Sequence, residues 1–221
     1  MAESNKPDGR RWSRGWWVLG VLYVIFFCWY TSFEGPLTEE EIAHFSRVIA
    51  NSPGGQDRLE RWQGFMQGDT GDDFAIWNAI DLFDTPKQVA GAEPGETSQQ
   101  VLDRYSSPFM SKALVRAGHP VMLGFSAGKA VDLWGLEGAD SWDQGALIRY
   151  RSRRDLLEMF EEITADESGI HAFKVAAMEK TLAFPLDPWF QLGDPRLVFA
   201  LLFIIIALLL QLRCNRQGEG P

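Results

Sequence analysis

The chain carries one long uncharged apolar run near each end, and these two runs constrain its architecture more than any other feature. Residues 16–33 read WWVLGVLYVIFFCWYTSF, and residues 197–212 read LVFALLFIIIALLLQL. A helix that crosses a bilayer needs about 20 apolar residues. The second run reaches that length if Asp194 caps the helix and Pro195 occupies its first turn, a favoured combination. We therefore expect transmembrane helices at 16–33 and 195–212.

Two other interpretations of the first run are weaker. A buried core helix is usually shorter and amphipathic, whereas this run is apolar on every face. A signal peptide would also follow basic residues, and Lys6, Arg10, Arg11 and Arg14 precede the run. However, a cleavage site needs small residues, and residues 26–30 read FFCWY. We therefore favour a retained anchor over a removed signal.

Basic residues in the two tails predict how the chain lies in the membrane. Four precede the first run, and Arg213 and Arg216 follow the second. The positive-inside rule then places tails 1–15 and 213–221 in the cytoplasm. The expected localisation is the cell inner membrane, with the central domain periplasmic or extracellular. Residues 31–196 hold 15 basic and 27 acidic residues, a net charge of −12. Such a surface argues against nucleic acid as a partner. Cys28 and Cys214 would lie on opposite sides of the bilayer and form no disulfide.

The central region predicts an α+β fold. Two helices, 38–51 and 56–67, are expected to form a collar over residues 34–71, the first of them opened by a capping box of Thr38 and Glu41. A domain at 72–187 and a linker at 188–194 follow. Within the domain the apolar runs and breaks predict alternating strands and helices, at 74–83 (strand), 97–117 (helix), 119–126 (strand), 142–150 (strand), a helix capped by Ser152, a helix at 166–180 and a strand at 181–184. This order is the split βαβ, or ferredoxin-like, pattern.

Residues 72–187 resemble the dimeric α/β barrel superfamily, and within it a branch of small bacterial domains of uncharacterised function. The resemblance rests on the first strand (WNAI, 77–80), on Tyr105, on the start of the second strand (GHPV, 118–121) and on the segment from Trp142 to Met159, which contains ALIRYRSRR. It covers about half of the chain. Relatives often carry a basic residue late in the first strand, where this chain has Asp81.

This resemblance implies that two ferredoxin-like sheets pack face to face across a two-fold axis, so that the protein is a homodimer. Some members of the superfamily bind small aromatic or tetrapyrrole ligands between the sheet and the helices. Asp81 weakens any ligand site that depends on a cation at that position. A fold alone does not carry a function from one protein to another.

Four residues are candidates for a ligand-binding site, namely Trp77, Asn78, Tyr105 and His119. Asn78 interrupts an apolar strand, and a buried amide needs a partner. Tyr105 and His119 would join it if the helix and the second strand lay beside it, and the three would form a polar group in an apolar pocket. Each also has an ordinary structural explanation: Asn78 bonded to neighbouring backbone, His119 bonded to a nearby carbonyl, and Tyr105 with its ring in the core.

No residue pattern specifies a reaction. His44, His119 and His171 lack metal-ligand spacing, so neither a metal nor another cofactor is expected. The basic run from Arg149 to Arg154 could bind an anion or an acidic partner. Arg153 and Arg154 precede four acids, Asp155, Glu158, Glu161 and Glu162, so pairs within the following helix explain most of the run. We expect a binding, sensing or assembly module without catalysis, with the bilayer, a second copy and a membrane protein as partners. The alternative is a cofactor-free oxygenase or isomerase that acts on a small apolar compound.

Overall fold

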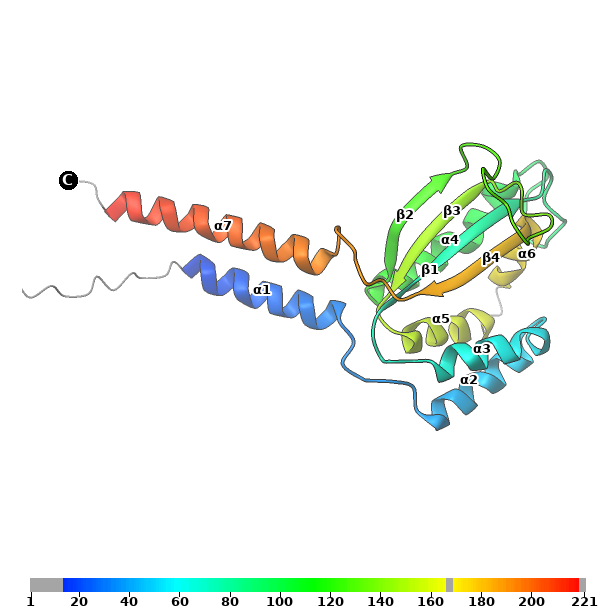
Figure 1. Ribbon diagram of the computed structural model, residues 1–221, viewed down its shortest axis with the longest axis horizontal. Coiled ribbons are helices and arrows are strands. Elements are labelled where there is room, and N and C mark those ends of the chain that lie inside the picture. The colour runs from blue at the N-terminus through cyan, green and yellow to red at the C-terminus, as the bar shows by residue number, and fades with distance from the viewer. Residues whose placement is uncertain (1–13, 166–168, 219–221) are drawn as a thin grey trace, which may run out of the picture. The chain divides into compact units, whose positions relative to one another are not determined.

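The computed structural model describes residues 14–165 and 169–218, and they form two compact units. One unit comprises the helical ends of the chain, up to Tyr30 and from Gln191 onward, and the other runs from Thr31 to Phe190. Figure 1 shows both units. Of the predicted tail 1–15, residues 1–13 lie outside the described residues. Of the predicted tail 213–221, residues 219–221 lie outside them.

The first unit is a pair of antiparallel helices, α1 (Arg14–Tyr30) and α7 (Pro195–Gly218). Phe26 meets Phe199 edge to face with ring centroids 4.8 Å apart, and one turn earlier Tyr23 meets Phe203 at 6.4 Å. The Tyr23 hydroxyl donates to the carbonyl oxygen of Arg196, 3.1 Å away. As contacts move back along α1 they move forward along α7, so the two helices run in opposite directions (Figure 1).

Among the described residues one helix is long and apolar enough to cross a membrane, the part of α7 from Pro195 to Asn215, with a mean hydropathy of 2.7. The helix α1 is apolar but has 17 residues. It ends at Tyr30, so residues 31–33 of the expected span lie outside it. The expected start of α7 is confirmed: Asp194 accepts a hydrogen bond from the backbone N–H of Arg196 at 2.7 Å, as an N-cap residue does.

The second unit has an α+β fold built on a four-stranded antiparallel sheet. Its strands are β1 (Phe74–Leu82), β2 (His119–Phe125), β3 (Gln144–Tyr150) and β4 (Met178–Leu186). Their order across the sheet is β2-β3-β1-β4. The last strand begins earlier than the predicted 181–184, because the preceding helix stops at Ala177 and not at 180. It also continues past the predicted end, to Leu186.

The described residues of this unit also form five α-helices and one short 3-10 helix. They are α2 (Glu39–Asn51), η1 (Gln56–Arg58), α3 (Leu59–Gln67), α4 (Ser98–Val115), α5 (Arg153–Ala165) and α6 (Ile170–Ala177). The predicted capping box of Thr38 and Glu41 is present, and Ser152 accepts from the backbone N–H of Asp155 at 3.0 Å. The part of the predicted helix at 166–168 lies outside the described residues.

The helices α2 and α3 are part of the domain and do not form a separate collar. Phe45 and Ile49 of α2 and Met66 of α3 pack against Leu157 of α5 in one buried cluster. Trp62 and Phe65 of α3 continue from this cluster to a second one around Phe74 and Tyr150 of the sheet. The apolar faces of α2 and α3 are therefore buried against the same core as the sheet.

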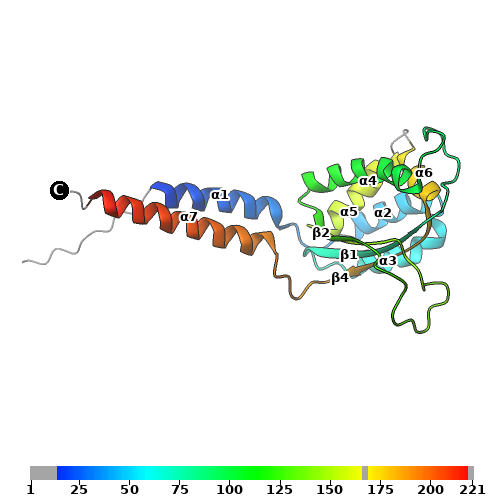
Figure 2. The same ribbon diagram turned by 90° about the horizontal axis from the view of Figure 1, so that it is seen from above.

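The core lies on one face of the sheet. Residues at alternate positions of β1, including Phe74, Ile76 and Ile80, pack against helical residues. A third buried cluster joins Val101 and Leu102 of α4 to Ala176 and Ala177 at the end of α6. Figure 2 shows α4, α5 and α6 together on this side of the strands.

The opposite face of the sheet is apolar at its centre and charged or polar at its two ends, where strand pairing places His119 with Arg149 and Asp81 with Lys180. No described helix covers it (Figure 1). Trp77 lies at its centre, because Trp77 pairs with Leu147 on one side and Phe184 on the other. We call the apolar centre of this surface the open face; its residues, given by the pairing of the strands, are Ala75, Trp77 and Ala79 of β1, Met122 of β2, Leu147 of β3, and Leu182, Phe184 and Leu186 of β4. Met122 and the three β4 residues are 39–50% exposed.

Candidate functional sites

The Asn78 side chain makes hydrogen bonds to the backbone of the sheet. Its amide nitrogen donates to the carbonyl oxygen of Ile76 at 3.2 Å and to that of Ala146 at 3.4 Å. Asn78 shares the covered face with Ile76 and Ile80. Neighbouring backbone therefore provides the partners that a half-buried amide needs. This is the structural explanation that the sequence offers for an asparagine in an apolar strand.

His119 lies on the other face of the sheet. It pairs with Arg149, three residues along β3 from Ala146, which pairs with Asn78. Since side chains alternate along a strand, an odd separation puts His119 and Asn78 on opposite faces. The Nδ1 atom of His119 is 3.0 Å from the carbonyl oxygen of Pro120. The bond to a nearby carbonyl, expected as the ordinary explanation, is present.

Tyr105 belongs to a small aromatic and basic group between α4 and α6. Its ring stacks on Phe109 with centroids 5.7 Å apart and meets His171 edge to face at 6.2 Å. The ammonium of Lys174 lies 5.4 Å from the centre of the Tyr105 ring. Burial raises the pKa of Tyr105 to about 12, so its hydroxyl stays protonated. Burial lowers the pKa of Lys174 and, together with the charge of Lys174, that of His171.

Trp77 is on the open face, against the backbone of β3. A Cβ atom added to Gly145 would lie 3.2 Å from the Cζ2 atom of Trp77, so the indole fits over this glycine. Trp77 therefore faces away from Asn78, its neighbour in the chain. Among the described residues, Trp77, Asn78, Tyr105 and His119 do not line one cavity. His171 and Lys174, which do surround Tyr105, carry no spacing in the sequence that distinguishes them.

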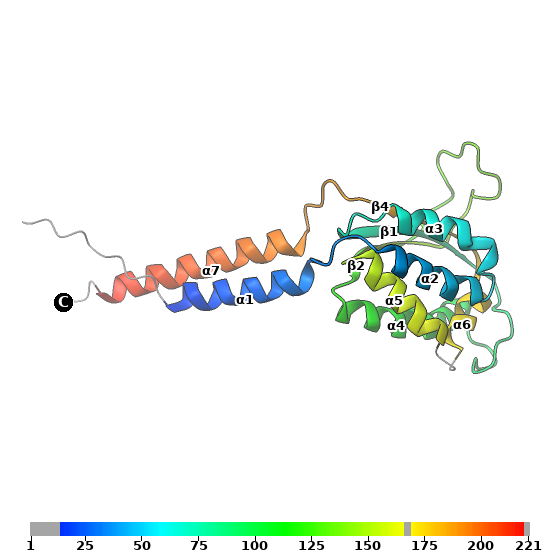
Figure 3. The ribbon, with the colours of Figure 1, turned by 90° about the horizontal axis from the view of Figure 1, so that it is seen from below.

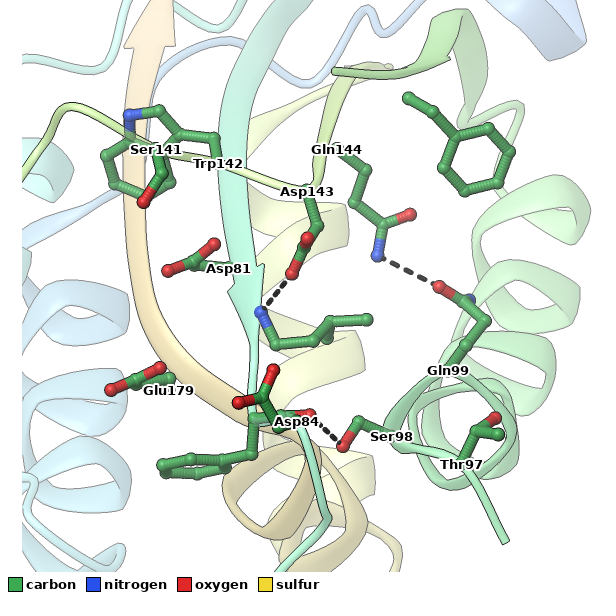
Figure 4. Close-up of a pocket in the computed structure, with 13 residues that line it drawn as sticks. Asp81, Asp84, Thr97, Ser98, Gln99, Ser141, Trp142, Asp143, Gln144 and Glu179 are labelled. Carbon is green, nitrogen blue, oxygen red and sulfur yellow. Dashed lines mark hydrogen bonds between the residues drawn. The ribbon is translucent and has the colours of Figure 1, made fainter. Parts of the chain in front are cut away.

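A cavity of the domain lies at one end of the sheet, where β1 ends and β3 and β4 begin. It has a volume of about 650 Å³ and is open to solvent. Figure 4 shows the four acidic residues that line it, Asp81, Asp84, Asp143 and Glu179, together with Ser98 at the start of α4. No member of the predicted set lines this cavity.

The hydrogen bonds of the cavity hold its walls together. Asp143 accepts from the backbone N–H of Leu82 at 2.7 Å, and Gln144 donates to Gln99 at 3.3 Å (Figure 4). Asp81, at its rim, is 3.3 Å from the ammonium of Lys180. No described group of three or more acidic, histidine or cysteine side chains has the arrangement of a metal site.

The basic run from Arg149 to Arg154 bonds distant parts of the domain. Arg149 is 1% exposed and binds Asp73 and the carbonyl oxygen of Ala117. Arg154 binds Glu41 of α2 at 2.6 Å. Arg151 pairs with Asp155 of the following helix. The local pairs expected for Arg153 and Arg154 are not their main partners: Arg153 lies 3.6 Å from Asp69, and the partner of Arg154 is more than a hundred residues away in the chain. These arginines therefore take part in structural ion pairs.

Comparison with known proteins yields similar structures but no family. No model of a protein family matches the chain, and no curated protein matches it. A crystal structure of RPA0582, a protein of unknown function from Rhodopseudomonas palustris, is 20% identical with a TM-score of 0.46; the match covers 60% of this chain and 94% of that one. A structure of methylated RPA0582 is 21% identical with a TM-score of 0.45, over 61% and 93% of the two chains.

Proposed function

We propose that this protein is a membrane-anchored module that works outside the cytoplasm and binds, senses or assembles without catalysing a reaction. Its central domain is ferredoxin-like, of the dimeric α/β barrel type, and it self-associates through the open face. The observation that carries the proposal is this exposed apolar sheet surface on a domain whose other sheet face is packed with helices along β1 and β3.

The assignment to the ferredoxin-like fold is supported by the order of the elements. After α3, the elements follow one another along the chain as strand, helix, two strands, two helices and a final strand. The two central strands of the sheet, β1 and β3, come from different halves of this pattern, and every neighbouring pair is antiparallel. This agrees with a split βαβ arrangement.

Self-association is supported by the character of the open face. Contiguous exposed apolar surface on a protein usually marks an interaction site. Phe184 is 40% exposed and lies beside Trp77, whose indole spans the centre of the face. Two such faces are self-complementary across a two-fold axis, because each presents the same apolar strips to the other.

Membrane anchoring is supported by the pair of terminal helices. The helix α7 has the length and composition of a span. Since α1 and α7 are antiparallel, the first residue of α1, Arg14, and the last residue of α7, Gly218, are at the same end of the pair. This supports a topology in which both tails lie on the cytoplasmic side.

The rival function, a cofactor-free oxygenase or isomerase, requires Asn78, Tyr105 and His119 to meet around a substrate. Asn78 and His119 lie on opposite sheet faces, and Tyr105 faces Lys174 and His171. No observation favours the catalytic function.

A charge on the open face tests the proposal. The full chain in detergent, studied by sedimentation over a range of concentrations, should form dimers that Phe184→Asp separates, because burying an unpaired carboxylate is costly. The matched control is Leu114→Asp, on the outer side of α4, where the side chain is 50% exposed. A dimer that resists Phe184→Asp as well as it resists Leu114→Asp would refute the open face as the interface.

A further inference from the structure

The loop between β2 and β3, residues 126–143, ends in a strongly apolar tip. Val131 is fully exposed, and Trp134 is 95% exposed. Leu133 and Leu136 beside them are exposed as well. An isolated exposed leucine is ordinary on a protein surface, but four large apolar side chains within six residues, one of them an indole, form a patch that calls for a partner.

The base of this loop is held firmly, while its tip extends from it. Ser126 donates its backbone N–H to the carbonyl oxygen of Asp143 at 2.7 Å, and Ala130 donates to that of Asp140 at 2.9 Å. Lys180 of β4 donates to the carbonyl oxygen of Gly138 at 2.6 Å. These bonds continue the pairing of β2 with β3 into the loop. The tip is thus presented at a defined position by a braced stem.

The loop projects on the side of the sheet that bears the open face. Figures 2 and 3 agree on this: the olive-green segment between β2 and β3 leaves the strands on the side opposite to α4, α5 and α6. Sheets that pack face to face lie about 10 Å apart. If the sheet of a second copy packed on the open face, this loop would lie beside that sheet and would contact it.

The size of the open face gives a reason for this contact. A four-stranded sheet with seven paired residues per strand is about 19 Å wide and 24 Å long, a plan area of about 450 Å². A stable interface buries about 800 Å² on each partner. The flat sheet surface supplies only part of that area, and the apolar tip of the loop adds to it.

Charge argues against a lipid surface as the occupant. The loop carries Lys129 as its basic residue and four acids, Asp132, Glu137, Asp140 and Asp143. Anionic headgroups would repel a segment with this balance. A second copy of the chain offers an apolar surface at the centre of its open face.

We propose that the loop 126–143 is an arm that grips the second copy of the chain in the dimer, with Trp134 as its anchor. This inference rests on the proposed self-association through the open face. Each arm reaches past the edge of its own sheet and packs its apolar tip on the partner. Exposed tryptophans that become buried in this way are often the residues that contribute most to binding.

Removal of the indole tests the arm. In sedimentation of the full chain in detergent, Trp134→Ala should raise the dissociation constant of the dimer by about 30-fold or more, the effect of losing an interface hot spot. The matched control is Trp189→Ala, since Trp189 is also 95% exposed but lies after β4. Its effect should stay within about threefold, as for most surface substitutions. Because Trp134 is exposed, the circular dichroism spectrum and the unfolding transition of Trp134→Ala should match those of the wild type.

The possible results distinguish the role of the loop as an arm from dimerisation through the open face. If Phe184→Asp dissociates the dimer and Trp134→Ala behaves like Trp189→Ala, the arm is overturned and the open face stands. If the wild type is a monomer at every concentration, the dimer fails and the arm with it. Hydroxyl-radical footprinting in nanodiscs of phosphatidylcholine tests the lipid surface: the arm predicts protection of Trp134 only in discs with two chains. Equal protection in discs with one chain would overturn it.

Discussion

Arg154 ties the segment before α2 to α5, and its replacement should loosen that segment. Its guanidinium lies 2.6 Å from Glu41 and 3.0 Å from Glu34, and it donates to the carbonyl oxygen of Pro36 at 3.3 Å. The Arg154 side chain is 12% exposed. The substitution Arg154→Met keeps much of the aliphatic length and removes the charge together with all of these hydrogen bonds.

The magnitude follows from Glu41. The hydrogen bond from Arg154, with smaller contributions from Thr38, lowers the pKa of Glu41 from 4.5 to about 2 in spite of the opposing effect of burial. A shift of that size corresponds to about 3.4 kcal/mol at neutral pH. Glu41 keeps 32% of its side chain exposed, so screening by solvent reduces the contribution to about 1–2 kcal/mol.

The pH dependence has a definite sign. Because the pKa of Glu41 is lower in the folded state, its contribution is complete above pH 4.5 and is lost as the pH falls toward 2. In Arg154→Met the pKa should return toward 4.5, since only the bonds to Thr38 remain. The difference in stability between wild type and variant should therefore be largest at neutral pH and shrink below pH 4.5.

Hydrogen exchange of the full chain in detergent measures this directly. Amides of residues 39–51 should exchange about 5–30 times faster in Arg154→Met at neutral pH. Lys112→Met is the control: it removes a more exposed ion pair, with Glu162 at 2.8 Å, and should change exchange of α2 little. Equal exchange of α2 in wild type and Arg154→Met would refute the assignment of Arg154 as the tie between these segments.

Three further results are expected. Leu157→Ala should destabilise the domain by about 2–5 kcal/mol in urea unfolding, because Leu157 is fully buried; a loss below about 1 kcal/mol would contradict its place in the core. Gly71→Ala should destabilise more than Gly54→Ala: both have positive φ, but a Cβ on Gly71 would lie 2.5 Å from the carbonyl carbon of Gly35, whereas Gly54 faces open space. In an ultraviolet absorbance titration Tyr105 should ionise near pH 12, and Tyr105→Phe should leave the titration below pH 11 unchanged; a tyrosine signal near pH 10 that disappears in Tyr105→Phe would contradict its burial.

The starts of helices could be predicted because they depend on a few neighbouring residues. Thr38 with Glu41, Ser152 with Asp155, and Asp194 before Pro195 each make their bonds within four residues, and all are found where the sequence places them. The end of α1 could not be predicted in the same way. Residues 31–33 continue the uncharged run, so composition carries no signal that the helix stops at Tyr30.

Side-chain faces and distant partners depend on how strands and helices pair across the fold. The sequence alone places Asn78 and His119 in strands, but the pairing of β2 with β3 decides that they face opposite ways. In the same way, Arg154 precedes several acids in its own helix, yet it binds Glu41 because α2 packs against α5. Local spacing predicts the candidates for an ion pair or a site, and tertiary packing selects among them.

The central claim is that the protein works as a membrane-anchored pair of chains. Single-molecule photobleaching tests it most directly, with one fluorescent label fused after residue 221 and the protein reconstituted in a lipid bilayer at low density. The account predicts that most wild-type spots bleach in two steps, and that Phe184→Asp spots bleach in one. A wild type that bleaches in one step, with the distribution of Phe184→Asp, would contradict it.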